Sequence, residues 1–278
     1  MCTINKLGNC LLLILAISVG IMSCQKMERP ALGNYPKDTN PPGGPLKFYA
    51  AMDGTNVDSI RANFGLNNDV SFAAGVSGDA LQPNGDKNGF VSYPSANDFS
   101  NVSSFTISFW MNVTLAQKDS VHAEGVLAFA NSNNFWSNVC IYADHESVTS
   151  DSMQLKFHFN AANNTDNWQA ANYVGNKRWP KMYDGQWHLV TITYDASDSL
   201  FTAYRDGAQF DQMTMNPAIK FENSSQLIVA GFQEAVGIVD NYGDNSWMAG
   251  FPGLMDNIRL YGEALSAADV QSLYTNKQ

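Results

Sequence analysis

The sequence predicts an all-β domain, a two-sheet antiparallel jelly-roll sandwich with one short C-terminal helix. Three observations lead to this prediction. Short segments alternate apolar and polar residues with a period of two, turn-forming residues separate these segments, and no regular alternation of strands with helices runs along the chain. Many short strands that are apolar on one face become stable when two sheets pack face to face.

The alternation is clearest over 105–113, where every second residue from Phe105 to Val113 is apolar. A strand with one face in a core has this pattern. The same criteria predict further strands at 125–130, 139–143, 154–159, 187–194, 200–205, 227–232 and 253–261. The dipeptides Asn84-Gly85, Asp184-Gly185 and Asp206-Gly207 predict turns between them.

One helix is predicted, over 266–274. Ser266 is a suitable N-cap, Asp269 lies in the first turn, and Val270, Leu273 and Tyr274 share one face.

The first 23 residues have the features of a secretory leader: one cation at Lys6, an apolar run over 11–19 and small residues before Cys24. The apolar run is shorter than the roughly 18 residues that span a bilayer. The segment Ile21-Met22-Ser23-Cys24 resembles the bacterial lipobox, which predicts that Cys24 is acylated and becomes the mature N-terminus. The residue after Cys24 is Gln25 and not Asp, which resembles lipoproteins that are passed on to the outer membrane. Residues 25–28 partly resemble the export tag of surface lipoproteins, so surface exposure is a hypothesis.

Residues 24–46 are predicted to form a lipidated N-terminus and a Pro/Gly-rich linker, and residues 47–278 the β domain. Cys140 is the cysteine that remains after the lipid site, so the mature domain has no intramolecular disulfide. A net charge of −10 without a Lys/Arg cluster excludes nucleic acid as an expected partner and favours neutral, hydroxyl-rich ligands over anionic polysaccharides.

Three segments, in this order, resemble the laminin-G type 3, pentraxin-related branch of the concanavalin-A-like lectin/glucanase superfamily. The first is 78–81 followed by 105–110, which ends in Trp110. The second is the hairpin 187–195 with 204–207, which begins Trp187-His188 and ends Asp206-Gly207. The third is 253–261 followed by 264–266. This resemblance implies a concanavalin-A-like sandwich, a fold that hosts lectins, adhesion domains and glycosidases alike.

In the strand 253–261, strict alternation would put Leu254, Asp256, Ile258 and Leu260 on one face, leaving a carboxylate in an apolar row. Such a charge requires a cation or several N–H donors. The resemblance implies a structural Ca²⁺ held by Asp256, with Asp53 and the Gly78 carbonyl as companion ligands. The alternative is that Asp256 only accepts hydrogen bonds.

The Glu-x-Asp-x-x-Glu strand of retaining glycosidases on this fold is absent, and no other catalytic signature is present, so we expect a non-catalytic protein. Three segments that are predicted to be loops combine tryptophan with amide and carboxylate side chains, the mixture that binds sugars: 131–138, 163–168 continuing to Trp179, and 240–247. The predicted ligand-binding residues are Asn134, Trp136, Asp166, Trp168, Trp179, Tyr242 and Trp247.

The expected function is therefore glycan capture by a surface or outer-membrane lipoprotein. A protein-binding or adhesion module is the main alternative, because laminin-G-like domains also bind proteins through their loops. A structural spacer and a glycoside hydrolase are less favoured.

Overall fold

The computed structural model describes residues 44–84, 89–145, 149–169, 178–238 and 245–277. The predicted leader, Cys24, most of the predicted linker and Tyr242 lie outside these residues. The described residues belong to one compact unit, Pro42–Gln278. No helix in this part of the chain is long and apolar enough to cross a membrane.

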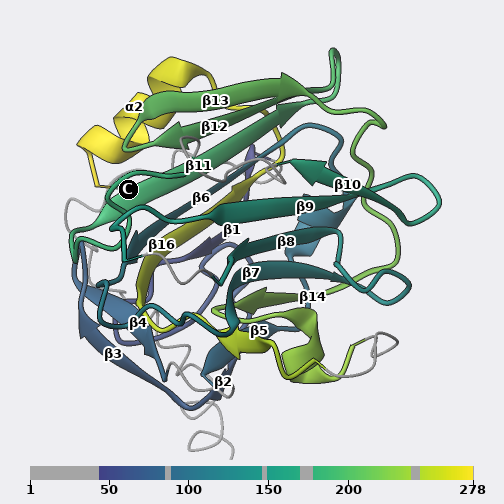
Figure 1. Cartoon of the computed structure of the whole chain (residues 1–278). Coiled ribbons are helices and arrows are strands. Elements are labelled where there is room, and N and C mark those ends of the chain that lie inside the picture. Colours follow the sequence, from purple (N-terminus) through teal and green to yellow (C-terminus); the bar gives the residue numbers. More distant parts are fainter. Residues whose placement is uncertain (1–43, 85–88, 146–148, 170–177, 239–244, 278) are drawn as a thin grey trace, which may run out of the picture. The chain divides into compact units, whose positions relative to one another are not determined.

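The first sheet has the strand order β13-β12-β11-β6-β16-β4-β3, and β1 also pairs with β16 (Figure 1). All of these pairs are antiparallel. The strands are β1 (Leu46–Ala50), β3 (Val70–Ala74), β4 (Asp79–Pro83), β6 (Phe105–Asn112), β11 (His188–Asp195), β12 (Leu200–Arg205), β13 (Ala208–Thr214) and β16 (Leu254–Tyr261).

The second sheet has the order β10-β9-β8-β7-β14-β5-β2, again antiparallel, with β15 added to β7 in parallel. Its strands are β2 (Leu66–Asn68), β5 (Phe90–Tyr93), β7 (Ala123–Asn131), β8 (Val139–Ala143), β9 (Leu155–Ala161), β10 (Thr165–Gln169), β14 (Ser224–Val229) and β15 (Met248–Gly250).

The inner faces of the two sheets share one core of buried apolar side chains. Phe105 of β6 in the first sheet meets Phe159 of β9 in the second, with ring centroids 6.0 Å apart. Both side chains are fully buried. Burial of each phenyl ring stabilises the fold by about 1.5–3 kcal/mol, so the facing aromatic residues hold the two layers together. The predicted two-sheet sandwich is confirmed.

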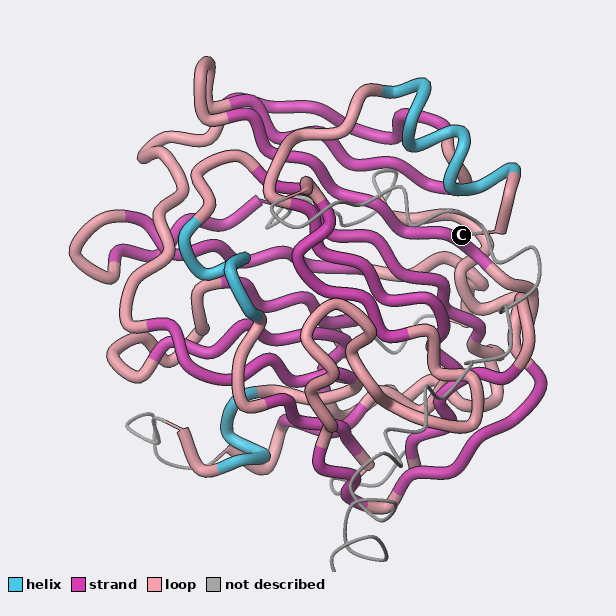
Figure 2. The backbone as a smooth tube through the Cα atoms, turned by 180° about the vertical axis from the view of Figure 1, so that it is seen from behind, coloured by secondary structure: helices cyan, strands magenta, loops and turns pink. Residues whose placement is uncertain are grey.

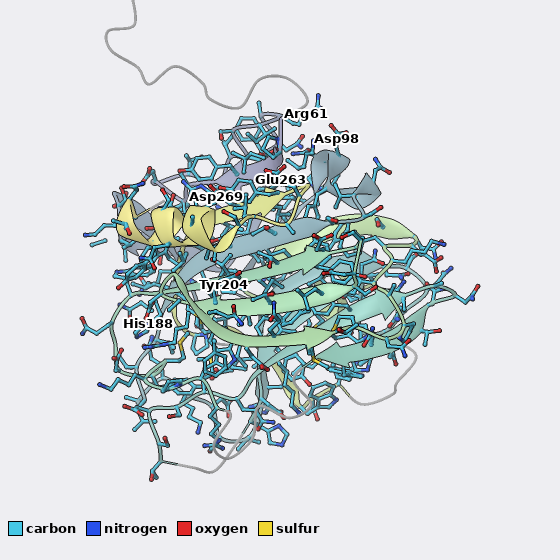
Figure 3. The ribbon with its side chains drawn as sticks, turned by 90° about the horizontal axis from the view of Figure 1, so that it is seen from above. Arg61, Asp98, His188, Tyr204, Glu263 and Asp269 are labelled. Carbon is cyan, nitrogen blue, oxygen red and sulfur yellow. The ribbon has the colours of Figure 1, made fainter. Side chains whose placement is uncertain are left out.

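Helix α2 (Ala267–Thr275) lies over the outer face of the first sheet (Figure 3). The ring of Tyr274 stacks on that of Trp110 at 5.6 Å. A capping box begins the helix as predicted. The N–H of Asp269 donates to Ser266 Oγ at 3.2 Å, and the N–H of Ser266 donates to Asp269 Oδ2 at the same distance. In the described part of the chain, two short 3-10 segments, η1 (Asn97–Asn101) and η3 (Gln233–Val236), are present besides α2 (Figure 2).

All eight predicted strands are present, as β6, β7, β8, β9, β11, β12, β14 and β16. Alternation did not predict the remaining strands, among them short buried ones such as β5 and exposed ones such as β2 and β13. Strand β2 has three exposed residues, and β13 is exposed along most of its length. Such strands carry no apolar face and so no period-two pattern. Residues 165–169, predicted to be a loop, form strand β10.

Candidate functional site

The outer face of the second sheet carries a row of aromatic and polar side chains on β8, β9 and β10. Cys140, His158 and Trp168 lie directly opposite one another across these strands. Phe157 and Phe159, the residues on either side of His158, are in the central core. Because successive side chains of a strand point to opposite faces, the row points away from the core.

Three tryptophans from separate segments meet on this face, and we call Trp136, Trp168 and Trp247 the tryptophan cluster. The ring of Trp136 lies 4.7 Å from that of Trp168, edge to face, and 5.7 Å from that of Trp247. It also stacks on Tyr142 at 5.9 Å. All three tryptophans are only partly buried, so they combine an apolar surface with access to solvent.

A carboxylate is fixed beside the tryptophan cluster. Oδ1 of Asp166 is 3.1 Å from Nε2 of His158 and accepts a hydrogen bond from Asn134 Nδ2 at 3.0 Å. His158 is fully buried and its ring lies 4.8 Å from that of Trp168. The side chain of Asp166 is 41% exposed, and no described residue donates to its second oxygen, Oδ2. This oxygen can therefore accept hydrogen bonds from a ligand.

Different interactions shift the pKa values of His158 and Asp166. Burial lowers the pKa of His158, although its hydrogen bond to Asp166 opposes that effect. The hydrogen bond from His158 lowers the pKa of Asp166, and the one from Asn134 acts in the same direction. At neutral pH the site therefore holds an ionised carboxylate oriented by a neutral imidazole.

One amide side chain makes several hydrogen bonds to the backbone of the loop that carries Trp136. Gln233, in η3, is 1% exposed. Its Nε2 donates to the carbonyls of Asn134 and Phe135 at 2.7 and 2.9 Å, and its Oε1 accepts the N–H of Asn131 at 3.0 Å. These three backbone groups belong to the last residue of β7 and to the loop that follows it, so Gln233 fixes the backbone on either side of the path to Trp136.

Further amides fix the same loop to β9 and to the segment before β14. Asn138 Nδ2 donates to the carbonyl of Glu222 at 2.9 Å, and its Oδ1 accepts the N–H of Glu222 at 2.8 Å. Asn134 Nδ2 donates to Asn160 Oδ1 at 3.0 Å. Hydrogen bonds in a buried network of this kind limit the freedom of the loop, and the site is organised before any ligand arrives.

The structure brings together Asn134, Trp136, Asp166, Trp168 and Trp247 of the predicted ligand-binding residues. Trp179 is different. It forms an isolated bridge with Met153, is fully buried in the central core and packs on Phe210 at 4.5 Å, so it has no surface to offer a ligand. Asp166 and Trp168 lie on strand β10, which fixes their spacing on one face.

Two residues of the site, Tyr142 and His158, were not predicted. The signal was present but weak. In the apolar run 139–143, Tyr142 is the one residue with a polar tip, and His158 stands at a polar position of the alternating segment 155–161. Gln233 had no signal in the sequence, because its role depends on contacts with residues about one hundred positions away.

Two of the predicted calcium ligands, Asp256 and Asp53, accept backbone N–H groups from the segment 76–79, and the third, the Gly78 carbonyl, accepts the N–H of Gly75 at 2.9 Å. Asp256 Oδ2 accepts the N–H groups of Val76 and Ser77 at 2.8 and 3.3 Å, in the turn that joins β3 to β4. Asp53 Oδ1 accepts the N–H of Asp79 at 2.9 Å. A Cβ on Gly78 would lie 1.9 Å from Asp53 Oδ1, so this close approach requires glycine there.

Asp256 does not share a face with Ile258 and Leu260, so that expectation is wrong. The register shifts between Asp256 and Arg259, and Asn257 has a φ of +51°. The bulge changes the phase of the alternation, so Met255, Ile258 and Leu260 enter the core while Asp256 faces the turn 75–78. The carboxylate is nevertheless fully buried.

The surroundings of Asp256 fit a hard cation in part. Its Oδ1 is buried, and no described residue makes a hydrogen bond to it. Burial raises the pKa of Asp256 to about 6, against the effect of its N–H donors, and the nearby charge of Asp53 adds to the rise. A cation would offset both effects. Among the described residues, however, no three His, Cys, Asp or Glu side chains form a metal cluster, so backbone oxygens or water would supply the other ligands.

Comparisons with known proteins agree with this architecture. The family model for laminin-G type 3 domains, described as the concanavalin A-like lectin/glucanases superfamily, matches residues 84–271. No curated protein matches the chain at a significant level.

Among solved structures, domain 4 of AbnA, a GH43 extracellular arabinanase from Geobacillus stearothermophilus in complex with arabinotriose, is similar with a TM-score of 0.54 at 18% identity. The match covers 83% of this chain and 98% of that domain. The binding domain of Paraclostridial Mosquitocidal Protein 1 has a TM-score of 0.59 at 16% identity and 84% coverage of this chain.

The binding domain of botulinum neurotoxin DC in complex with rat synaptotagmin II has a TM-score of 0.56 at 15% identity, again over 84% of this chain. This chain spans about half the length of these toxin domains, 52% in both cases. At such identities the likeness concerns the fold. The fold, the three matching sequence segments and the family match over most of the chain lead to one conclusion. The chain belongs to the concanavalin A-like lectin/glucanase superfamily.

Proposed function

We propose that this protein is a non-catalytic binding module that captures neutral glycans on the outer face of its second sheet. The observation that carries the proposal is the meeting of Trp136, Trp168 and Trp247, from three separate segments, beside the fixed carboxylate of Asp166.

The chemistry of the site matches that of a sugar. The apolar C–H faces of a sugar ring pack on indole rings, and the free Oδ2 of Asp166 accepts hydroxyl protons. The ionised Asp166 and the net charge of −10 disfavour anionic sugars, because like charges repel in a partly desolvated site. Asp166 has His158 and Asn134 as partners, not a second carboxylate, and this arrangement favours binding over glycoside hydrolysis.

The structural neighbours support a binding role in general. The arabinanase domain was solved in complex with arabinotriose, and one botulinum neurotoxin binding domain in complex with SialylT. The binding domain of the same toxin, botulinum neurotoxin DC, was also solved in complex with rat synaptotagmin II, and this complex supports protein binding as the second candidate.

The test is a glycan array with wild-type protein and with Trp136→Ala, Trp168→Ala and Trp247→Ala. Trp187→Ala is the matched control, because Trp187 is partly buried in the cluster beneath α2 on the first sheet. We expect one class of neutral glycans to bind the wild type and the control, and each of the three cluster variants to lose at least ten-fold in affinity. A blank array with retained binding to a protein partner would support adhesion in its place.

Placement at the membrane is part of the proposal. A lipid on Cys24 would anchor the domain to the outer membrane, exposed at the cell surface. Growth with a clickable fatty acid should label the wild type and leave Cys24→Ala unlabelled. Protease added to intact cells should then remove the domain. An unlabelled wild type would exclude the anchor, and a domain left uncut would exclude surface exposure.

We also propose that Asp53 and Asp256, with the Gly78 carbonyl, hold a structural Ca²⁺. Calcium at one hundred times its dissociation constant would stabilise the fold by about 2.7 kcal/mol. At about 2–4 °C per kcal/mol for a domain of this size, chelation should lower Tm by about 5–10 °C. An unchanged Tm on chelation, with no calcium found by elemental analysis, would exclude the site.

A further inference from the structure

A second polar group lies on the outer face of the second sheet, beyond the tryptophan cluster. On β9, Lys156 lies two residues before His158, and Phe157 between them is in the core, so both outer residues point away from it. Lys156 Nζ forms an ion pair with Asp144 Oδ2 and lies 5.8 Å from the centre of the Tyr142 ring. We call Lys156 with Asp144 the lysine anchor.

The tryptophan cluster lies between Asp166 and the lysine anchor. Asp166 of β10 is opposite Asn160 of β9, four residues from Lys156 on the same strand. At about 3.3 Å per residue, these two levels of the sheet are about 13 Å apart. Trp168 is opposite His158, midway between them. A ligand that follows β9 from Asp166 to Lys156 therefore passes over the tryptophan cluster.

The two ends of this path offer complementary hydrogen-bonding groups. The ammonium group of Lys156 has three N–H donors, and the ion pair with Asp144 is the one contact of these donors within the described residues. The side chain of Lys156 is 20% exposed, so its remaining donors can reach a ligand. At the other end, Oδ2 of Asp166 accepts. Since Asp144 balances the charge of Lys156, the lysine anchor gives an acidic sugar no advantage over a neutral one.

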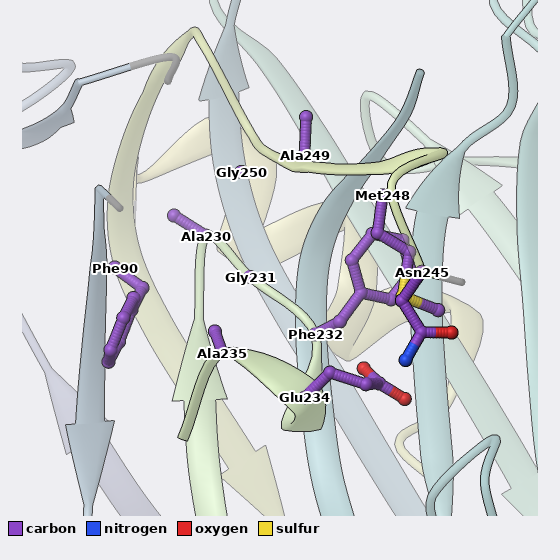
Figure 4. A pocket seen from close by; sticks show the side chains of 10 residues that line it. All are labelled: Phe90, Ala230, Gly231, Phe232, Glu234, Ala235, Asn245, Met248, Ala249 and Gly250. Atoms are coloured by element: carbon purple, nitrogen blue, oxygen red, sulfur yellow. The ribbon is translucent and has the colours of Figure 1, made fainter. Parts of the chain in front are cut away.

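The face is less suited to a sugar in the direction across the strands, toward β14 and β15. There a hollow of about 170 Å³ has a mainly apolar lining that includes Phe232 and Met248 (Figure 4). The carboxylate oxygens of Glu234, its charged lining group, are buried away from solvent. They do not meet the hydroxyls of a ligand, so the path along β9 is the one with an accessible charged group at each end.

The length of this path sets the smallest ligand that uses all of it. With single bonds of about 1.5 Å, a sugar ring measures about 5–6 Å from oxygen to oxygen along its length. One ring thus spans less than half of the separation between the two levels, and two linked rings span most of it. A single sugar placed at Asp166 and the tryptophan cluster leaves the lysine anchor without a contact.

We propose that the site takes two linked sugars of a neutral oligosaccharide, one at Asp166 and the tryptophan cluster and the next at Lys156. The inference rests on the proposed glycan-binding function and deepens it by naming the size of the ligand and a residue that determines this preference. Lys156 donates to the hydroxyls of the second sugar, and its ion pair with Asp144 holds the ammonium group in place before the ligand arrives.

The test is an NMR titration with the mono-, di- and trisaccharide of a glycan class identified on the array. Wild-type protein should bind the disaccharide at least ten-fold more tightly than the monosaccharide. Lys156→Met should reduce this gain to less than three-fold and leave the affinity for the monosaccharide unchanged, which also shows that the variant is folded. Lys156→Arg keeps a donor and should retain most of the gain. Arg61→Met removes the cation of another ion pair, with Asp98, and is the matched control that should keep the full gain.

Equal affinities for the mono- and disaccharide, or an undiminished gain in Lys156→Met, would overturn the lysine anchor, while binding lost in Trp168→Ala would still uphold the glycan-binding function. A preference for an acidic over a neutral disaccharide that disappears in Lys156→Met would also overturn it, because Lys156 would then act as an unbalanced cation. Absence of binding to every glycan on the array would overturn both proposals.

Discussion

The substitution Gln233→Glu tests whether one buried amide positions the loop that carries Trp136. The change keeps the shape of the side chain and the oxygen that accepts the N–H of Asn131. It replaces the donor that serves the carbonyls of Asn134 and Phe135 with an oxygen. These two carbonyls then each lose one hydrogen bond in a place where Gln233 is 1% exposed, while the carbonyl of Asn134 keeps the N–H of Ser137 as a donor at 3.1 Å.

A hydrogen bond contributes about 0.5–1.5 kcal/mol net, so the loss of two should lower the free energy of unfolding by at least about 1 kcal/mol. At about 2–4 °C per kcal/mol, Tm should fall by at least about 2 °C at pH 7. The matched control is Gln271→Glu on the exposed side of α2, which should stay within about 0.5 kcal/mol of the wild type.

The loss of stability should depend on pH. Burial and the two carbonyls raise the folded-state pKa of the introduced carboxyl above its ordinary value of about 4.3. A group with a raised pKa contributes most stability when it is protonated, so the deficit should be smaller at pH 4 and grow as the pH rises through the folded-state pKa. Differential scanning calorimetry at pH 4 and pH 7 measures both effects. A variant with the Tm of the wild type at both pH values would refute the positioning role of Gln233.

Two further substitutions test other parts of the structure. Gly78→Ala should lower the free energy of unfolding by more than about 1 kcal/mol, because φ is +70° and the added Cβ would meet Asp53 Oδ1. The control is Gly237→Ala, which has a φ of +74° and open space around it and should show the backbone cost alone. Equal losses for the two variants in urea denaturation would contradict the predicted clash. Burial disfavours the charged form of His188, but hydrogen bonds to Asp206 and Asp184 outweigh it and raise its pKa. A raised pKa stabilises the fold at low pH, and this contribution disappears as the pH rises through the folded-state pKa. His188→Gln should therefore reduce the loss of Tm between pH 6 and pH 8. If the variant and the wild type lose the same Tm over this range, the charge of His188 does not contribute to stability.

The fold could be predicted because its central strands carry their own pattern. Strand β6 alternates over its whole length, and β11 and β16 read as strands even where both of their faces are buried. The edges could not be predicted in the same way. Strands β2 and β13 are held by hydrogen bonds to their neighbours, and their exposed side chains follow no period.

The residue types of the site could be predicted from the sequence, but most of its geometry could not. Tryptophans next to amides and carboxylates indicated a ligand site, and the fold brings Trp136, Trp168 and Trp247 together. The sequence did not distinguish these from Trp179, because the residues that bury Trp179 come from distant strands. The position of Asp256 depended on a bulge, and alternation alone cannot locate a bulge.

The most direct test of glycan binding at the tryptophan cluster is an NMR titration of the six indole N–H signals with a glycan identified on the array. The signals of Trp136, Trp168 and Trp247 should shift together along one saturation curve, while those of Trp110, Trp179 and Trp187 stay in place. Shifts confined to Trp187, or saturation with no change in the three cluster signals, would place the binding surface elsewhere on the molecule.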